Sequence, residues 1–141
     1  MLTATGRYGR ALLSLCLLAL AGCGSGYYPV QGKVTLEDGT PLTRGMVVFE
    51  SVDGTQMARG TIGADGTYQL STGSPGDGVK PGRYRALVSA LDMTDVPDEQ
   101  KTLPFDIKYT RLQTSGLEFE VKAGPNDIPI KLTRPTSRKK N

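Results

Sequence analysis

The 141-residue chain contains no histidine and no tryptophan. The absence of histidine excludes Ser-His-Asp triads, Cys-His dyads and any imidazole acting as an acid or base near neutral pH. Zinc sites built on histidine are excluded for the same reason. The absence of tryptophan weakens the case for a sugar-binding platform, because such platforms favour exposed aromatic rings. We therefore expect a protein that is not an enzyme and that holds no cofactor and no metal.

Cysteine is scarce, and one of the two cysteines lies in an apolar segment near the N-terminus. This segment covers residues 11–21, contains Cys16 and follows Arg7 and Arg10. A helix of this length rises only about 16 Å, whereas the hydrocarbon core of a bilayer is about 30 Å thick. A basic flank, a short apolar stretch and small residues at its end are the three parts of an export signal. We therefore leave the segment out of the predicted fold.

The end of this segment, Leu20-Ala21-Gly22-Cys23, resembles the lipobox of bacterial lipoproteins. The resemblance implies that a signal peptidase removes residues 1–22 and that Cys23 is the lipid attachment site. Its sulfur would carry a diacylglycerol, and its amine a further acyl chain such as palmitate. Two or three acyl chains anchor a protein stably, whereas a single chain is only marginal. Residues 23–26 would then be the lipidated cysteine and a flexible Gly-Ser-Gly tether.

Two other interpretations of the N-terminus remain open. Ala19-Leu20-Ala21 also fits the pattern of an ordinary secretory signal, whose cleavage would release a soluble protein beginning at Gly22. Alternatively, the segment stays uncleaved. The lipoprotein interpretation is favoured because it explains Cys23, which would otherwise be a lone thiol on an exported protein. It predicts a location in the bacterial cell envelope, facing the periplasm or the exterior. Gly24 favours the outer membrane, because some enterobacteria mark inner-membrane retention with an aspartate at this position.

The charge balance argues against nucleic acid as a partner. Without residues 1–22, the chain has 15 basic and 14 acidic side chains, and four of the basic ones lie in residues 134–141. The folded part is therefore slightly acidic, unlike the basic surface that binds a phosphate backbone. The basic tail 134–141 has no apolar periodicity, and we predict that it is disordered. Contact with an anionic membrane surface or a cell-wall polymer is the alternative interpretation of this tail.

Glycine and proline are abundant, and apolar residues alternate at spacing two, which predicts short strands joined by turns. Four Asp-Gly pairs recur 12 to 15 residues apart, as in a sandwich of hairpins. We expect a single all-β domain over residues 27–133. The seven predicted strands are residues 30–36, 46–49, 57–62, 67–70, 83–88, 117–121 and 128–132. Residues 71–78 are predicted to form a mobile loop, residues 91–104 a long connection and residues 122–127 a turn. Pro129, which lacks an amide donor, places the last strand at a sheet edge or turns the proline side of that strand toward solvent.

The order of these features resembles the carboxypeptidase regulatory-like family. The resemblance rests on Val30-x-Gly32-x-Val34, Asp38-Gly39-x-Pro41-Leu42, Val47-x-Phe49, Asp65-Gly66-x-Tyr68-x-Leu70 and Pro81-Gly82-x-Tyr84. It spans about residues 27–90 and, with the closing segments near Gly116 and Asn126, is similar to small lipoproteins of planctomycete-type bacteria. The resemblance implies a transthyretin-like Greek-key sandwich of seven strands. Tyr68 and Tyr84 alternate with apolar residues, so we expect their rings inside and their hydroxyls at the rim.

Acidic residues are the remaining candidates for chemistry. Four aspartates each precede a glycine without the clustered spacing of a calcium loop, and they are interpreted as hairpin turns: Asp38, Asp53, Asp65 and Asp77. Glu118 and Glu120 share the polar face of one strand, whereas a glycosidase needs two carboxyls across a cleft. Glycine-rich residues 73–82 lack the Gly-Lys-Ser/Thr and the helix of a phosphate loop. We therefore assign no catalytic, cofactor-binding or metal-binding residue.

Basic side chains within the domain are interpreted as a solvated surface. Arg83 and Arg85 share one strand face, opposite in orientation to Tyr84, and could meet anionic sugars or lipid head groups. The predicted function is a lipid-anchored, monomeric module that binds an envelope protein or a glycan, or that has a structural role. Alternatives are a carbohydrate-binding module, with Tyr27 and Tyr28 as the exposed aromatic residues, and an envelope hydrolase, for which no cleft pair is visible.

Overall fold

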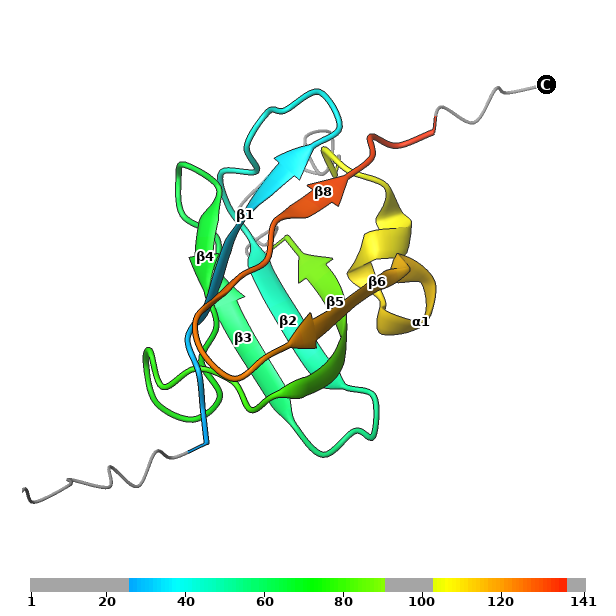
Figure 1. Cartoon of the computed structure of the whole chain (residues 1–141). Helices are drawn as coiled ribbons and strands as arrows, with labels where there is room; N and C mark the ends of the chain where they lie inside the picture. Colours follow the sequence, from blue (N-terminus) through cyan, green and yellow to red (C-terminus); the bar gives the residue numbers. More distant parts are fainter. Residues whose placement is uncertain (1–25, 91–102, 137–141) are drawn as a thin grey trace, which may run out of the picture.

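The computed structural model describes residues 26–90 and 103–136. Within them the chain forms eight strands and two short helices (Figure 1). These are β1 (Val30–Leu36), β2 (Met46–Ser51), β3 (Met57–Thr61), β4 (Thr67–Gln69), β5 (Gly82–Ser89), the 3₁₀ helix η2 (Ile107–Thr110), α1 (Leu112–Ser115), β6 (Leu117–Val121), β7 (Asn126–Asp127) and β8 (Ile130–Leu132). None of these helices is long and apolar enough to cross a membrane. The predicted signal peptide, lipobox and Cys23 lie outside the described residues.

The strands form two sheets that pack as a β-sandwich. One sheet has the order β3-β2-β5-β6 and is antiparallel throughout. In the other sheet, β1 pairs with β4 on one side and, in parallel, with β7 and β8 on the other. The prediction of an all-β domain is therefore confirmed. The described residues nevertheless form eight strands where the sequence predicted seven.

The additional strand arises at Pro129. The Ile128 amide donates to the Gln31 carbonyl at 2.8 Å, but Pro129 has no amide to continue the ladder. The predicted strand 128–132 is thus shortened to β8, and β7 forms within the segment predicted as the turn 122–127. Within the part of the chain that the structure describes, both strands have β1 as their only strand partner, which agrees with the expected edge position of Pro129.

The sandwich core consists of the alternate residues of each strand. Alternation places Val30, Val34 and Leu36 of β1 inside, and β5 contributes its buried residues in the same way. Phe49 of β2 stacks on Phe119 of β6 with ring centroids 5.3 Å apart and lies 6.2 Å from the Tyr84 ring. Burial of these rings supplies much of the hydrophobic stabilisation.

The two sheets approach each other closely where β3 lies beside the end of β4. The Arg59 and Ser71 backbones exchange two hydrogen bonds of 2.9 Å across the sheets. A side chain at Gly60 would overlap the carbonyl oxygen of Gln69, so only glycine permits this approach.

Residues 103–115 form a helical segment that the sequence did not predict. Phe105 and Tyr109 are buried, the Asp106 amide donates to the Thr133 carbonyl at 2.9 Å, and the Ser115 hydroxyl donates to the Ala86 carbonyl at 2.6 Å. Helices of four residues are too short to show a helical period. Their position depends on contacts with β5 and with the residue after β8 instead.

Candidate binding surface

Three of the four Asp-Gly aspartates form the same turn. Asp38, Asp53 and Asp65 each accept a hydrogen bond from the amide of the threonine two residues later, at 2.9 to 3.1 Å. This is an Asx turn, in which a side-chain carboxylate replaces a backbone carbonyl. The interpretation of these three aspartates as turns is therefore confirmed, but only the turn at Asp53 joins two paired strands, β2 and β3, as a hairpin does. The turns at Asp38 and Asp65 connect strands of different sheets.

The hydrogen bonds of these turns hold the carboxylates in the ionised form. The Ser51 hydroxyl, followed by the Thr55 amide and hydroxyl, lowers the pKa of Asp53 to about 2. The Thr67 hydroxyl and amide lower the pKa of Asp65. A carboxyl group with a lowered pKa is a poor general acid near neutral pH. These aspartates therefore act as turn-forming groups.

Asp77 organises the glycine-rich loop 71–78. Its carboxylate accepts hydrogen bonds of 2.8 Å from the amides of Thr72, Gly73 and Ser74, and these amides lower its pKa. The Thr72 hydroxyl also donates to the Gly78 carbonyl at 2.8 Å. The predicted loop is confirmed, and within it one carboxylate binds three consecutive amides.

Acidic side chains and tyrosine hydroxyls are among the groups of the described residues whose contacts bear on a reactive site. No three acidic or cysteine side chains in residues 26–90 and 103–136 lie close enough to hold a metal ion. The Tyr68 hydroxyl donates to the Ile128 carbonyl at 2.6 Å, and burial raises its pKa. The Tyr84 hydroxyl donates to the Lys80 carbonyl at 2.9 Å. The Tyr68 hydroxyl is thus buried, and not at the rim where the sequence placed it.

The N-terminal tyrosines pack against the domain. Tyr28 exchanges two backbone hydrogen bonds of 2.9 Å with Val79, and the Lys80 ammonium lies 5.4 Å from the centroid of the Tyr27 ring. Both tyrosines are half-buried, whereas the carbohydrate-binding alternative required them to be exposed. An open hollow of about 650 Å³ beside β3 and residues 71–75 has no aromatic residue in its lining. The hollow therefore offers no aromatic ring to a sugar, and Tyr27 and Tyr28 are less exposed than the carbohydrate-binding alternative assumed.

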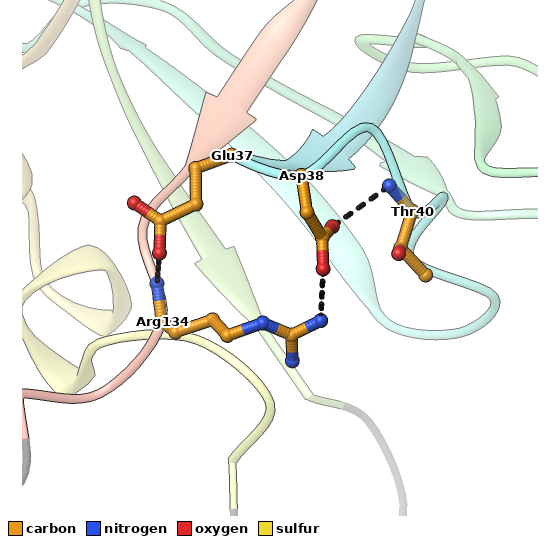
Figure 2. A network of polar contacts seen from close by, with 4 residues as sticks. All are labelled: Glu37, Asp38, Thr40 and Arg134. Atoms are coloured by element: carbon orange, nitrogen blue, oxygen red, sulfur yellow. Dashed lines mark hydrogen bonds and ion pairs between the residues drawn. The ribbon is translucent and has the colours of Figure 1, made fainter.

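The start of the basic tail is attached to the turn after β1. The Arg134 guanidinium pairs with the Asp38 carboxylate, and the backbone amide of Arg134 donates to the Glu37 carboxylate at 3.3 Å (Figure 2). The hydrogen bond from Arg134 is the main cause of the lowered pKa of Asp38. Arg134 is therefore held in place, although the sequence predicted disorder for the whole tail; residues 137–141 lie outside the described part.

The two ends of the described chain lie at opposite ends of the sandwich. The chain enters at the start of β1 and leaves after β8, which runs parallel to β1 (Figure 1). The loop 71–78 and the β2–β3 turn lie at the end where the chain enters. The β1–β2 turn, with Asp38 and Arg134, lies at the other end.

Charged side chains line the outer face of the β3-β2-β5-β6 sheet. Arg83 and Arg85 share this face, opposite to the buried Tyr84, as predicted. Arg85 lies between Glu50 of β2 and Glu118 of β6, and Arg83 lies opposite Glu120. The Arg83 guanidinium is 3.6 Å from the Glu118 carboxylate, with both side chains exposed. Glu118 and Glu120 thus face solvent beside arginines, and β6 lies at the edge of its sheet among the described residues.

Comparison with known proteins gives little further information. No family model matches the chain, and no curated protein matches it. Among solved structures, the chain is similar to a DUF3823 family protein from Parabacteroides merdae, with 15% sequence identity and a TM-score of 0.46. The match covers 76% of this chain and 46% of the other, so the chain spans less than half of that protein.

Proposed function

We propose that the chain is a lipoprotein of the bacterial cell envelope, with a transthyretin-like, carboxypeptidase regulatory-like sandwich as a non-catalytic binding or structural module. Residues 1–22 would be removed, and acyl chains on Cys23 would hold the protein in a membrane, with the outer membrane favoured. The observation that carries the proposal is the lipobox Leu20-Ala21-Gly22-Cys23 directly before a folded domain. Its predicted partners are a membrane and an envelope protein or glycan.

The position of Tyr27 and Tyr28 determines how such an anchor would orient the domain. Only residues 24–26 separate Cys23 from Tyr27, and three extended residues span about 10 Å. The end of the sandwich with loop 71–78 would therefore lie close to the lipid head groups. The opposite end, with Arg134 and the start of the basic tail, would point away from the membrane that holds the anchor.

The state of the acidic residues supports a role without catalysis. The Asp-Gly aspartates are engaged in turns with lowered pKa values, and Glu118 and Glu120 lie on an exposed strand. A hydrolase would need two carboxyls across a cleft, one of them with a raised pKa. The sandwich itself would therefore act by presenting its surface.

Membrane partitioning of the full-length protein tests the anchor. We expect the wild type to pellet with membranes from the native host and Cys23→Ala to remain in the soluble fraction. Cys16→Ala is the matched control, because Cys16 lies in the segment that would be removed, and it should partition like the wild type. Equal partitioning of wild type and Cys23→Ala would contradict the proposal.

A further inference from the structure

Among residues 26–90 and 103–136, β6 is the last strand of its sheet, with β5 on one side. The Val52 amide donates to the Arg83 carbonyl at 3.0 Å, so the peptide groups of Arg83 point toward β2. Successive residues of an antiparallel strand point to alternate neighbours, and Tyr84 and Ala86 therefore pair with Phe119 and Leu117 of β6. The amide and carbonyl groups of Glu118 and Glu120 therefore lie in the plane of the sheet and point away from β5. Within the described residues, β6 has β5 as its only strand partner.

Two apolar side chains of β6 remain partly exposed to solvent. Leu117 and Phe119 pack against the core but remain half-buried, whereas Tyr84 and Ala86, which face them from β5, are buried. A further strand beside β6 would place its inward side chains next to Leu117 and Phe119 and remove them from water. Such a strand gains main-chain hydrogen bonds and apolar contacts together.

The charges of the outer face specify what the added strand should carry. Along one row the sign alternates from Glu50 through Arg85 to Glu118, and the next row pairs Arg83 with Glu120. Opposite charges facing each other across strands are stabilising, and like charges are destabilising. The positions opposite Glu118 and Glu120 therefore favour lysine or arginine.

The same charges disfavour pairing between two copies of this chain. In an antiparallel pair of β6 strands centred on Phe119, Glu118 of one copy would face Glu120 of the other. Charged edge strands are a common protection against such self-association. In this register the charges of the edge therefore favour a different chain over a second copy.

We propose that β6 accepts an antiparallel strand from an envelope protein, in which apolar residues alternate with lysine or arginine. The partner's apolar residues cover Leu117 and Phe119, and its basic residues face Glu118 and Glu120. This inference rests on the proposed binding function and names its partner class.

The test uses the full-length protein in nonionic detergent, two short charged peptides and an uncharged reference peptide, all labelled. One charged peptide has the core Val-Lys-Val-Lys-Val and the other Val-Glu-Val-Glu-Val, and fluorescence anisotropy measures the binding of all three at low salt. Two cross-strand ion pairs predict that the lysine peptide binds about 2- to 30-fold more tightly than an uncharged reference peptide. The glutamate peptide should bind more weakly than that reference. Amide hydrogen exchange at Glu118 and Glu120 should slow in the bound state.

Variants of the edge separate its charge from its backbone. Glu118→Lys/Glu120→Lys should reverse the peptide preference, and the matched control Glu118→Gln/Glu120→Gln should abolish it. Glu120→Pro removes an amide that points away from β5, so it should abolish binding while circular dichroism shows a retained fold. Equal affinity for both peptides, or binding without slowed exchange at Glu118 and Glu120, would overturn the proposal. Absence of binding to either peptide would overturn it as well.

The anchor and the edge can fail independently. Cys23→Ala should leave peptide binding unchanged, and the lysine variants should leave membrane partitioning unchanged. If Cys23→Ala no longer partitions into membranes but keeps its preference for the lysine peptide, both proposals are supported. If Cys23→Ala still partitions into membranes, the lipid anchor is refuted and the strand-binding edge is not.

Discussion

Gly32 and Tyr68 form a contact whose removal gives a quantitative test of the fold. Tyr68 of β4 reaches over β1 and donates its hydroxyl to the Ile128 carbonyl at 2.6 Å. It passes β1 at Gly32, where an added Cβ would overlap the Ile128 carbonyl oxygen and lie 3.0 Å from the Tyr68 ring. The glycine of the Val30-x-Gly32-x-Val34 motif thus leaves room for a hydrogen bond that connects β4 with the chain between β7 and β8.

Two substitutions should destabilise the domain by different routes. Tyr68→Phe leaves the buried Ile128 carbonyl without this donor, which costs about 1–3 kcal/mol in the free energy of unfolding. Gly32→Ala forces the backbone apart, and overpacking of this kind costs about 1–3 kcal/mol in addition to the weakened hydrogen bond. Because Gly32→Ala already displaces the acceptor, the double variant should lose less than the sum of the two single effects.

Urea unfolding followed by far-ultraviolet circular dichroism measures these effects, and a domain of this size should unfold in a single transition. A loss of 1 kcal/mol also lowers Tm by about 4–8 °C for 60–100 residues. Leu117→Ala is the comparison variant for the free energy of unfolding, because Leu117 is only half-buried and lies away from the Gly32 contact. Its effect should add to that of Tyr68→Phe. Wild-type stability in Gly32→Ala, or strict additivity in the double variant, would refute the reasoning.

Two further predictions concern the aspartate turns. Since hydrogen bonds lower the pKa of Asp53 to about 2 and also lower that of Asp65, the stability that these carboxylates contribute should be complete above about pH 5. It should be lost as the pH falls toward 2, and Asp53→Asn should flatten part of this dependence in acid titrations followed by circular dichroism; an unchanged profile would contradict the assignment. Asp77→Ala removes the acceptor for three amides, so hydrogen exchange at Thr72, Gly73 and Ser74 should accelerate while β1 stays protected. Unchanged exchange in the loop would show that Asp77 does not hold it.

Most of the strands could be predicted because alternation and turn chemistry are local. The segments around Val34, Phe49 and Tyr84 show apolar residues at spacing two, and Asp-Gly marks the turns after β1, β2 and β3. The limits of β7 and β8 could not be predicted, because their parallel pairing with β1 joins residues almost a hundred positions apart.

Features that depend on tertiary contacts were missed. The helical segment around Phe105 and Tyr109 has no periodicity of its own and is positioned by Thr133 and Ala86. The three hydrogen bonds that the Asp77 carboxylate accepts in loop 71–78 are local, but composition does not show them either. Similarly, the sequence identified Glu118 and Glu120 as polar-face residues but could not show that β6 lies at a sheet edge.

The central claim is that Cys23 carries lipid, and the intact mass of the protein purified from its native host tests it most directly. The account predicts a product that lacks residues 1–22 and carries the added mass of a diacylglycerol with or without a further acyl chain. Cys23→Ala should not yield this product. A protein that begins at Gly22, with an unmodified thiol at Cys23, would contradict the account and favour a secreted binding protein.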